Sequence, residues 1–405
     1  MSQSTRPLVT LNSHITLCNL TQQTENGVVI IGRGDEFVEL PVEGVDFLGW
    51  LNQGLSLAEA RDRFEARHNP FPDDDVLELI DVFLDSDFVA AVDGQPVHQH
   101  PMARRATAPW FKPQWASALF SSPVLVAWMG FVIPAAVLWV KTPELWPRRS
   151  DYFWIDYNFL IVLVGILLWL AGMITHELAH WVAARARGIE ATITWTQRLG
   201  FFPMSQTIMH NIWAVPRANR LLPIAAGMVW DIFSISVVLY LLYFNLTGVI
   251  ALPILVVSLL KFYLLTSTMA LIAQFWLFSK MDGYFLLSAL FGQRNLQADS
   301  YNWLKSNVAK IGQFDPPRSG MRFIYLYLFI TLFWGGLFMG QFLLVDLPIK
   351  LQLLWESLVK VWDTTQLTSL NFADGVAVLT SQTIFWGLLA YAYWRDTLPN
   401  WRGAS

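Results

Sequence analysis

The sequence predicts a mainly α, polytopic helical membrane protein with about six transmembrane helices, preceded by a small α+β winged-helix-like soluble domain. Three observations support this fold class. The 405 residues are 54% hydrophobic and only 14% charged, which lies outside the usual range of soluble globular proteins. About six apolar stretches of bilayer length follow residue 116. Segment 1–95 instead alternates polar and apolar side chains and contains helix-capping signals.

The N-terminal segment 1–95 is expected to fold as strands, then three helices, then a closing strand. Ser56 and Glu59 form the pattern of a capping box, and Gly54 suits the C-terminus of the helix before it. The predicted strands are 14–20, 27–32, 36–40 and 88–92, and the predicted helices are 42–52, 57–68 and 75–85.

A proline-rich linker, 96–116, separates this domain from a membrane domain, 117–405. The linker carries Arg104, Arg105 and Lys112, which are typical of the basic flank beside a first transmembrane helix. His98 and His100 are an H-x-H pair that could bind a metal, but their proline-rich setting favours an ordinary linker.

Six membrane spans are expected after the linker. Lys and Arg concentrate in alternate loops, so the positive-inside rule predicts that both termini are cytoplasmic. The expected spans are 117–140, 157–184, 221–244, 255–278, 323–345 and 376–394.

The charge and cysteine content exclude several classes of protein. The net charge is −4 and no block of like charge is present, so nucleic acid is not an expected partner. Cys18 is the single cysteine, which rules out an intramolecular disulfide. The first 13 residues are polar, so no signal peptide is expected there.

The second span ends in the pattern H-E-x-x-H, formed by His176, Glu177 and His180. Two histidines four residues apart project from one face of a helix and can hold the same Zn²⁺. A catalytic zinc takes three protein ligands and leaves its fourth position to water. Glu177 would lie beside that water and could accept its proton, so the motif predicts zinc-dependent hydrolysis.

Asp282 is the favoured third zinc ligand. The second and fourth spans run in the same direction under the predicted topology, so Asp282 would reach the depth of the two histidines. Gly283 is expected to let the start of a helix pack close to the metal. Two alternatives remain open: Asp231, inside the third span, could be a ligand or could orient a ligand histidine, and His210 could be a ligand.

These motifs resemble the site-2 protease family of intramembrane zinc metallopeptidases, and most closely its bacterial peptide zinc metalloproteases. The resemblance extends over about 160–296 and includes the turn 213–216, the Ala-Gly-Met of 226–228, and Asp-Gly-Tyr of 282–284. It implies a zinc metalloendopeptidase of a bacterial cytoplasmic membrane. The family often has Asn-Pro shortly before Asp-Gly, whereas this chain has Phe275 to Lys280 there, so any role of that pair is not implied.

Segment 189–195 alternates apolar and polar residues, which predicts a strand beside the zinc motif. An open strand edge could bind substrate as an added strand, and a purely structural hairpin is the alternative. The candidate substrate-binding residues are Glu190, Ala191, Thr192, Ile193 and Thr194.

The N-terminal domain resembles PqqD-like peptide-recognition domains, which implies that a leader peptide binds at a sheet edge. A domain that only regulates or dimerises is the alternative. We therefore expect a multi-pass membrane protease that removes the leader or propeptide of a ribosomally made, modified peptide near the cytoplasmic face. Expected partners are the precursor peptide or a membrane-protein substrate, membrane lipid, and export or peptide-modification proteins. A regulatory intramembrane protease and a non-catalytic scaffold with a relic zinc site remain as alternatives.

Overall fold

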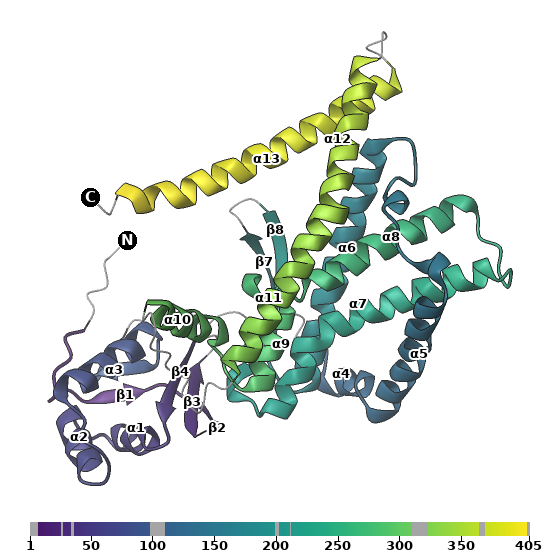
Figure 1. Cartoon of the computed structure of the whole chain (residues 1–405). Coiled ribbons are helices and arrows are strands. Elements are labelled where there is room, and N and C mark those ends of the chain that lie inside the picture. Colours follow the sequence, from purple (N-terminus) through teal and green to yellow (C-terminus); the bar gives the residue numbers. More distant parts are fainter. Residues whose placement is uncertain are drawn as a thin grey trace. The chain divides into compact units, whose positions relative to one another are not determined.

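The computed structural model describes residues 7–25, 27–33, 36–97, 110–198, 202–210, 212–309, 323–363 and 369–402 (Figure 1). The chain divides into two compact units. The first comprises Met1–Ala116, Ala184–Thr192 and Ile208–Leu222, and the second comprises Ser117–Ala183, Ile193–Thr207 and Pro223–Ser405. The predicted boundaries at 95 and 116 stay predictions, and the linker residues His98, His100, Arg104 and Arg105 lie outside the described residues.

The N-terminal part of the first unit combines six strands with three helices. Both of its sheets are antiparallel, with strand orders β1-β5-β6 and β2-β3-β4. The elements are β1 Ile15–Leu17, β2 Thr21–Glu25, β3 Val28–Arg33, β4 Glu36–Pro41, α1 Gly44–Asn52, α2 Leu57–Glu65, α3 Asp73–Asp85, β5 Val89–Val92 and β6 Gln95–Pro96.

The sequence predicted the helices and most strands of this part, but it missed β2. The predicted strand 14–20 is in fact the short β1, and the chain then forms a second strand that pairs with β3 from Thr21 opposite Gly32 to Glu25 opposite Val28. The sequence of β2, TQQTE, has no apolar face, so alternation of side chains could not reveal it. Backbone pairing with β3 forms the strand instead.

The predicted capping box at α2 is confirmed. The Ser56 hydroxyl accepts a hydrogen bond from the Glu59 N–H, and the Glu59 carboxylate accepts one from the Ser56 N–H. The bond from the Ser56 backbone lowers the pKa of Glu59. Gly54 has φ of +83° just after α1, where a residue with a side chain would be strained. Helices and strands enclose one core whose fully buried members include Ile31, Phe47 and Ile80.

Most of the remaining chain is helical. Six helices in the described residues are long and apolar enough to cross a membrane, as the sequence predicted. The elements are α4 Pro113–Leu119, α5 Ser122–Lys141, η1 Pro143–Leu145, η2 Arg149–Tyr152, α6 Asn158–Ala186, β7 Ala191–Arg198, β8 Phe202–Met209, η3 Ile212–Ala214, α7 Arg217–Leu246, α8 Ile254–Ala273, η4 Leu277–Ser279, α9 Asp282–Phe291, α10 Leu296–Ala309, α11 Ile324–Gln341, a π-helix Phe342–Asp346, α12 Leu347–Trp362 and α13 Leu370–Arg402.

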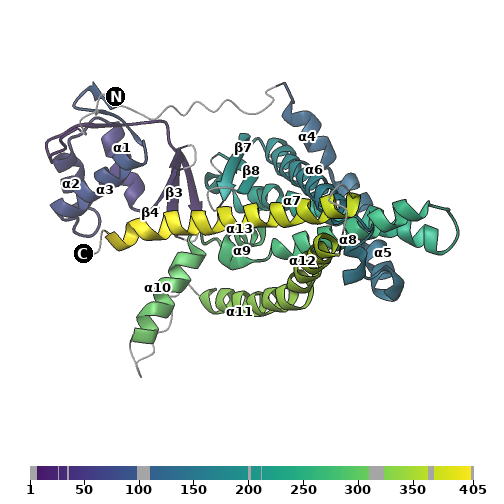
Figure 2. The same cartoon turned by 90° about the horizontal axis from the view of Figure 1, so that it is seen from above.

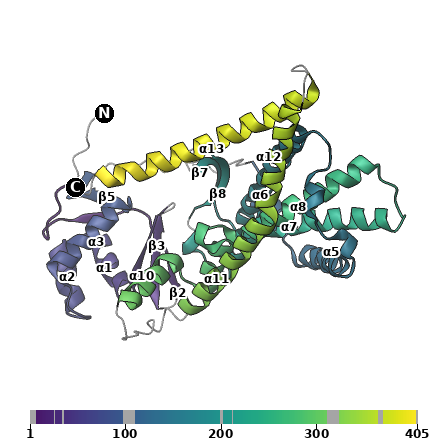
Figure 3. The same cartoon turned by 45° about the horizontal axis from the view of Figure 1, so that its top comes forward.

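Several spans differ from their predicted bounds: the first, α5, begins at Ser122 rather than at residue 117, and the sixth, α13, covers Leu370–Arg402 rather than 376–394. The fourth, α8, ends at Ala273 rather than at residue 278, and the chain turns through η4 before α9 begins. The fifth continues from α11 through the π-helix into α12 as one unbroken helical ribbon, which curves in the view from above (Figures 1, 2 and 3). A single π-turn inserts an extra residue without ending a helix, and apolar periodicity does not detect it.

The first turn of α6, the helix that carries the H-E-x-x-H motif, is held by a buried carboxylate. Asp374 of α13 is 5% exposed and accepts hydrogen bonds from the backbone N–H groups of Asn158 (3.1 Å) and Phe159 (2.6 Å). Lys360 of α12 lies 2.8 Å from the same carboxylate. A negative charge at a helix N-terminus satisfies otherwise unpaired N–H groups and interacts well with the helix dipole.

We predict that Asp374→Ala destabilises the second unit by about 3 kcal/mol, because it leaves the Lys360 ammonium and two N–H groups without their buried partner. Thermal unfolding in detergent, followed by circular dichroism, measures the change. Asp363→Ala, at the exposed end of α12, is the control and should leave the unfolding temperature unchanged. Equal unfolding temperatures for the two variants would contradict this role of Asp374.

Candidate metal centre

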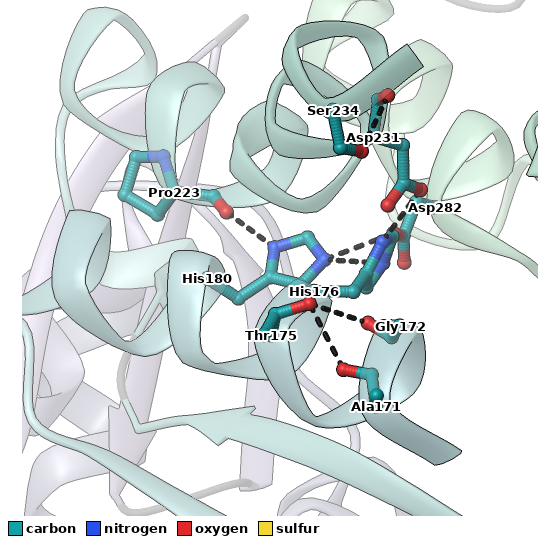
Figure 4. A network of polar contacts seen from close by, with 9 residues as sticks. All are labelled: Ala171, Gly172, Thr175, His176, His180, Pro223, Asp231, Ser234 and Asp282. Carbon is teal, nitrogen blue, oxygen red and sulfur yellow. Dashed lines mark hydrogen bonds and ion pairs between the residues drawn. The ribbon is translucent and has the colours of Figure 1, made fainter. Parts of the chain in front are cut away.

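Three helices of the second unit bring four ionisable side chains together (Figure 4). His176 and His180 project from α6 and are only 7% and 4% exposed. Their ring centroids lie 4.8 Å apart, as the four-residue spacing predicted. Asp231 comes from α7 and Asp282 from the first residue of α9.

Three potential ligand atoms converge at this point. Oδ2 of Asp282 lies 2.8 Å from Nε2 of His176 and 2.9 Å from Nε2 of His180, and the two Nε2 atoms are 3.1 Å apart. A tetrahedral zinc with bonds of about 2.0–2.1 Å separates its ligand atoms by about 3.3 Å. Each of these three side chains offers one ligand atom, so among the described residues they form a group that could hold a metal ion.

The outer nitrogens of both rings have partners of their own. Nδ1 of His180 lies 2.7 Å from the Pro223 carbonyl oxygen, which can only accept a hydrogen bond, so this nitrogen carries the proton. Nδ1 of His176 lies 2.8 Å from Oδ2 of Asp231 and donates to that carboxylate in the same way. With the protons on Nδ1, both neutral rings direct the Nε2 lone pair towards Asp282. Zinc-binding histidines are oriented by this kind of contact.

Gly227 of α7 leaves open the space between the histidines. A Cβ built on this residue would lie far inside van der Waals contact with Nε2 of both His176 and His180. Because Gly227 has no side chain, its backbone lies close to the two Nε2 atoms and leaves a small space between them. We call this space, bordered by Gly227, His176 and His180, the metal cradle. Two imidazole nitrogens and a carboxylate oxygen are a usual donor set for zinc, so the residues fit this ion.

Asp282 is directed at the histidines and does not cap its own helix. The N-cap position of α9 is Met281, which makes no side-chain capping bond. A Cβ on Gly283 would meet the Gln274 carbonyl oxygen at 2.6 Å, so the missing side chain lets the start of α9, which carries Asp282, pack on the residues just after α8. The close approach to the two histidine nitrogens is made by Gly227.

The helix break before Asp282 forms without the Asn-Pro pair. Lys280 adopts a left-handed conformation, with φ of 51° and ψ of 48°, and turns the chain from η4 into α9. This conformation costs a residue with a side chain of order 1 kcal/mol. Such strain is often stored next to functional sites.

Glu177 lies between the two histidines in sequence and is half-buried. Its backbone carbonyl accepts a hydrogen bond of 2.9 Å from the Thr207 hydroxyl. Among the residues that the structure describes, its carboxylate makes no hydrogen bond or ion pair.

The two alternative ligands occupy different places. Asp231 contacts the far nitrogen of His176, which is the orienting role considered for it. Nε2 of His210 lies 3.1 Å from the Thr192 hydroxyl, and among the described residues the three ligand atoms that converge come from His176, His180 and Asp282. The assignment of His176, His180 and Asp282 as ligands stays a prediction that this geometry favours.

The predicted strand near the motif is present as β7, and its hairpin partner β8 is the strand that contacts α6. Thr207 of β8 donates to Glu177, and the Ser205 N–H lies 3.3 Å from Sδ of Met173. The sequence analysis did not predict β8, because Pro203 lacks the backbone N–H that a strand donates to its neighbour. The candidate substrate residues vary in exposure: Glu190 is exposed, Ala191 and Thr192 are buried, and Ile193 and Thr194 are half-buried.

Comparisons with protein-family models, with curated proteins and with solved structures gave no match for this chain. The inferences below therefore depend on its residues and their geometry.

We predict that Gly227→Ala abolishes zinc binding, because the added methyl group occupies the space between the two Nε2 atoms. Zinc content per purified chain, measured by atomic absorption, tests this. Gly130→Ala in α5 is the matched control, since a Cβ there meets no atom within 4 Å. Full zinc occupancy in Gly227→Ala would show that the metal does not bind in this cradle.

We further predict that Asp282→Ala loses zinc, whereas Asp231→Asn keeps it with an affinity about 10–100-fold weaker. Asp282 would supply a ligand atom, and Asp231 would only orient His176. Competition with a chromophoric chelator measures both affinities. Loss of zinc in Asp231→Asn together with retention in Asp282→Ala would exchange the two roles, and loss in His210→Ala alone would favour His210.

Proposed function

We propose that this protein is a membrane-embedded zinc metalloendopeptidase. The observation that carries the proposal is the convergence of two buried imidazole Nε2 atoms and one carboxylate oxygen. Glu177 follows the first of these histidines on the same helix. Six helices of membrane-spanning length and composition make a membrane setting consistent with the chain. Costly ionisable groups at such positions are usually functional.

His176, His180 and Asp282 would hold the zinc, and Asp231 and the Pro223 carbonyl would keep the two rings in the correct tautomer. When bound, zinc polarises the scissile carbonyl and lowers the pKa of water. Glu177 accepts a proton from the attacking water while the water oxygen bonds to the carbonyl carbon of the scissile amide. The same carboxyl group then gives that proton to the nitrogen of the leaving amine as the C–N bond breaks.

The β7–β8 hairpin is the proposed docking place for an extended substrate segment. A protease needs the scissile amide in extended form, and a strand edge binds such a segment through backbone hydrogen bonds. The contact of Thr207 with the Glu177 carbonyl brings this hairpin to the motif helix. Glu190, Ala191, Thr192, Ile193 and Thr194 of the β7 region remain the proposed substrate-binding residues.

The proposed substrate is a precursor peptide whose leader or propeptide is removed near the cytoplasmic face of a bacterial membrane. The strand-helix-strand order of segment 15–96 is compatible with a PqqD-like domain that captures the leader. Export or peptide-modification proteins would be partners. A regulatory intramembrane protease would not need to capture a leader, so binding of a leader peptide to this domain would argue against that alternative. A scaffold with a relic site would not depend on zinc, so a zinc-dependent activity would argue against the scaffold.

The direct test of the proposal is Glu177→Gln. We expect this variant to bind zinc as the unaltered chain does, because Glu177 supplies no ligand atom. Cleavage of a precursor peptide reconstituted with the protein in liposomes should fall by about 10²–10⁴-fold, since a general base contributes that much. Glu144→Gln, at an exposed acid of η1 that has no proposed part in the site, controls for the loss of one carboxylate. A Glu177→Gln variant with full activity would refute the proposed mechanism.

A further inference from the structure

An open apolar groove lies in the second unit, where α5 ends and η1 follows it. The groove has a volume of about 360 Å³ and is lined by Trp139, Val140, Trp146 and Pro147. Helix α5 is long and apolar enough to cross a membrane, so its last turn would lie in the headgroup region of a bilayer. Tryptophan side chains are enriched at this depth. A groove in this place would therefore be accessible to lipid.

Contacts within the second unit hold the groove in shape. The indole Nε1 of Trp146 donates a hydrogen bond of 2.7 Å to the Trp139 carbonyl oxygen, which ties this ring to the end of α5. Leu145, the residue before it, is 4% exposed and belongs to a core cluster with Leu239 of α7 and Leu264 of α8. Because the groove is already formed, a ligand that enters it loses little binding free energy to ordering of the protein.

Three cations flank the groove in the sequence. Lys141 follows the last lining residue of α5 directly, and Arg148 and Arg149 follow the last lining residue of the loop. Glu144 is the only acid in 139–149. All three cations are exposed, and none of them makes an ion pair with the residues that the structure describes. Like charges this close repel one another, so an anion that binds among them is favoured.

Arg149 is held in place by a neutral partner. Its Nη2 donates to Oε1 of Gln352 in α12 at 2.9 Å, and Nε2 of Gln352 donates to Oε1 of Glu356 at 2.8 Å. The amide fixes one side of the guanidinium without neutralising its charge. The remaining N–H groups of Arg149 are thus left for an anion, and a guanidinium matches the oxygens of a phosphate well.

The predicted topology does not explain these cations. Lys and Arg concentrate in the loops that are expected to be cytoplasmic, whereas the loop after α5 would face the opposite side. The next loop expected on that side, 247–253, contains no Lys or Arg. The three cations beside the groove therefore point to a role other than setting the orientation of the helices.

We propose that this groove binds an anionic phospholipid, with one acyl chain along the four lining residues and the headgroup phosphate among Lys141, Arg148 and Arg149. A phospholipid fits because it joins an apolar chain to an anion, and here an apolar groove adjoins a group of cations. A soluble anion would use only the cations, and a zwitterionic lipid carries a positive charge that these cations repel. The inference does not depend on the proposed protease activity.

Native mass spectrometry of the full-length chain in detergent, titrated with phosphatidylglycerol or with phosphatidylcholine, measures this binding. One phosphatidylglycerol per chain should bind more tightly than phosphatidylcholine. Lys141→Gln with Arg148→Gln should weaken phosphatidylglycerol binding about 25-fold, since each cation at a membrane surface contributes about fivefold. This variant keeps the contact of Arg149 with Gln352. Val140→Trp fills part of the groove and should weaken binding about tenfold, by displacing about two methylene groups of the chain.

Lys305→Gln with Arg187→Gln is the matched control, because it removes an exposed lysine and an exposed arginine elsewhere in the chain. It should leave phosphatidylglycerol binding unchanged, as should Lys141→Arg with Arg148→Lys, which keeps both charges. Unchanged affinity in the Lys141→Gln, Arg148→Gln variant or in Val140→Trp would refute the proposal. Equal binding of the two lipids would also refute it, as would displacement of phosphatidylglycerol by equimolar inorganic phosphate, because the site would then hold a free anion.

Discussion

The organisation of the second unit depends on one constraint, which is that three electron-rich atoms meet in a buried place. Two Nε2 lone pairs and a carboxylate oxygen lie within 3.1 Å of one another. Without a positive charge between them, such an arrangement is repulsive, and the apolar surroundings strengthen the repulsion. The hydrogen bonds to Asp231 and Pro223 keep both lone pairs directed inwards, so the surrounding groups stabilise the arrangement that needs a cation.

This constraint explains several local features that would otherwise be costly. Glycine is unfavourable inside a helix, but Gly227 allows α7 to approach the two histidines closely. Helix α8 ends early, and Lys280 adopts a left-handed conformation so that α9 can begin with Asp282. The start of a helix also carries a partial positive charge, which suits a carboxylate that must remain ionised. Each of these features is local. Together they place the Asp282 carboxylate next to the Nε2 atoms of His176 and His180.

The sequence predicted the parts of this site that follow a periodic rule. The spacing of His176 and His180 predicted that both project from one helix face. The alternation of basic loops predicted that Asp282 lies at the same membrane depth as the two histidines. Gly227 was quoted only as part of a motif, because a glycine inside an apolar helix looks the same whether it faces lipid, a neighbour or a metal. Its role depends on the approach of α7 to α6, which is a long-range contact. The strand β2 was missed for a related reason, since its backbone partner β3 rather than its side-chain pattern defines it.

A shared proton is the strongest competitor of a metal at this site, and the geometry argues against it. One proton between the two Nε2 atoms would satisfy two lone pairs and leave the Asp282 oxygen, 2.8 and 2.9 Å away, facing the acceptor side of a ring. Two protons, one on each Nε2, could both be donated to Oδ2 of Asp282, but with protons already on both Nδ1 atoms this would bury two positively charged rings side by side. A divalent ion satisfies all three atoms at once and leaves room for a fourth ligand. In the proposed mechanism this fourth ligand is the water whose proton Glu177 accepts.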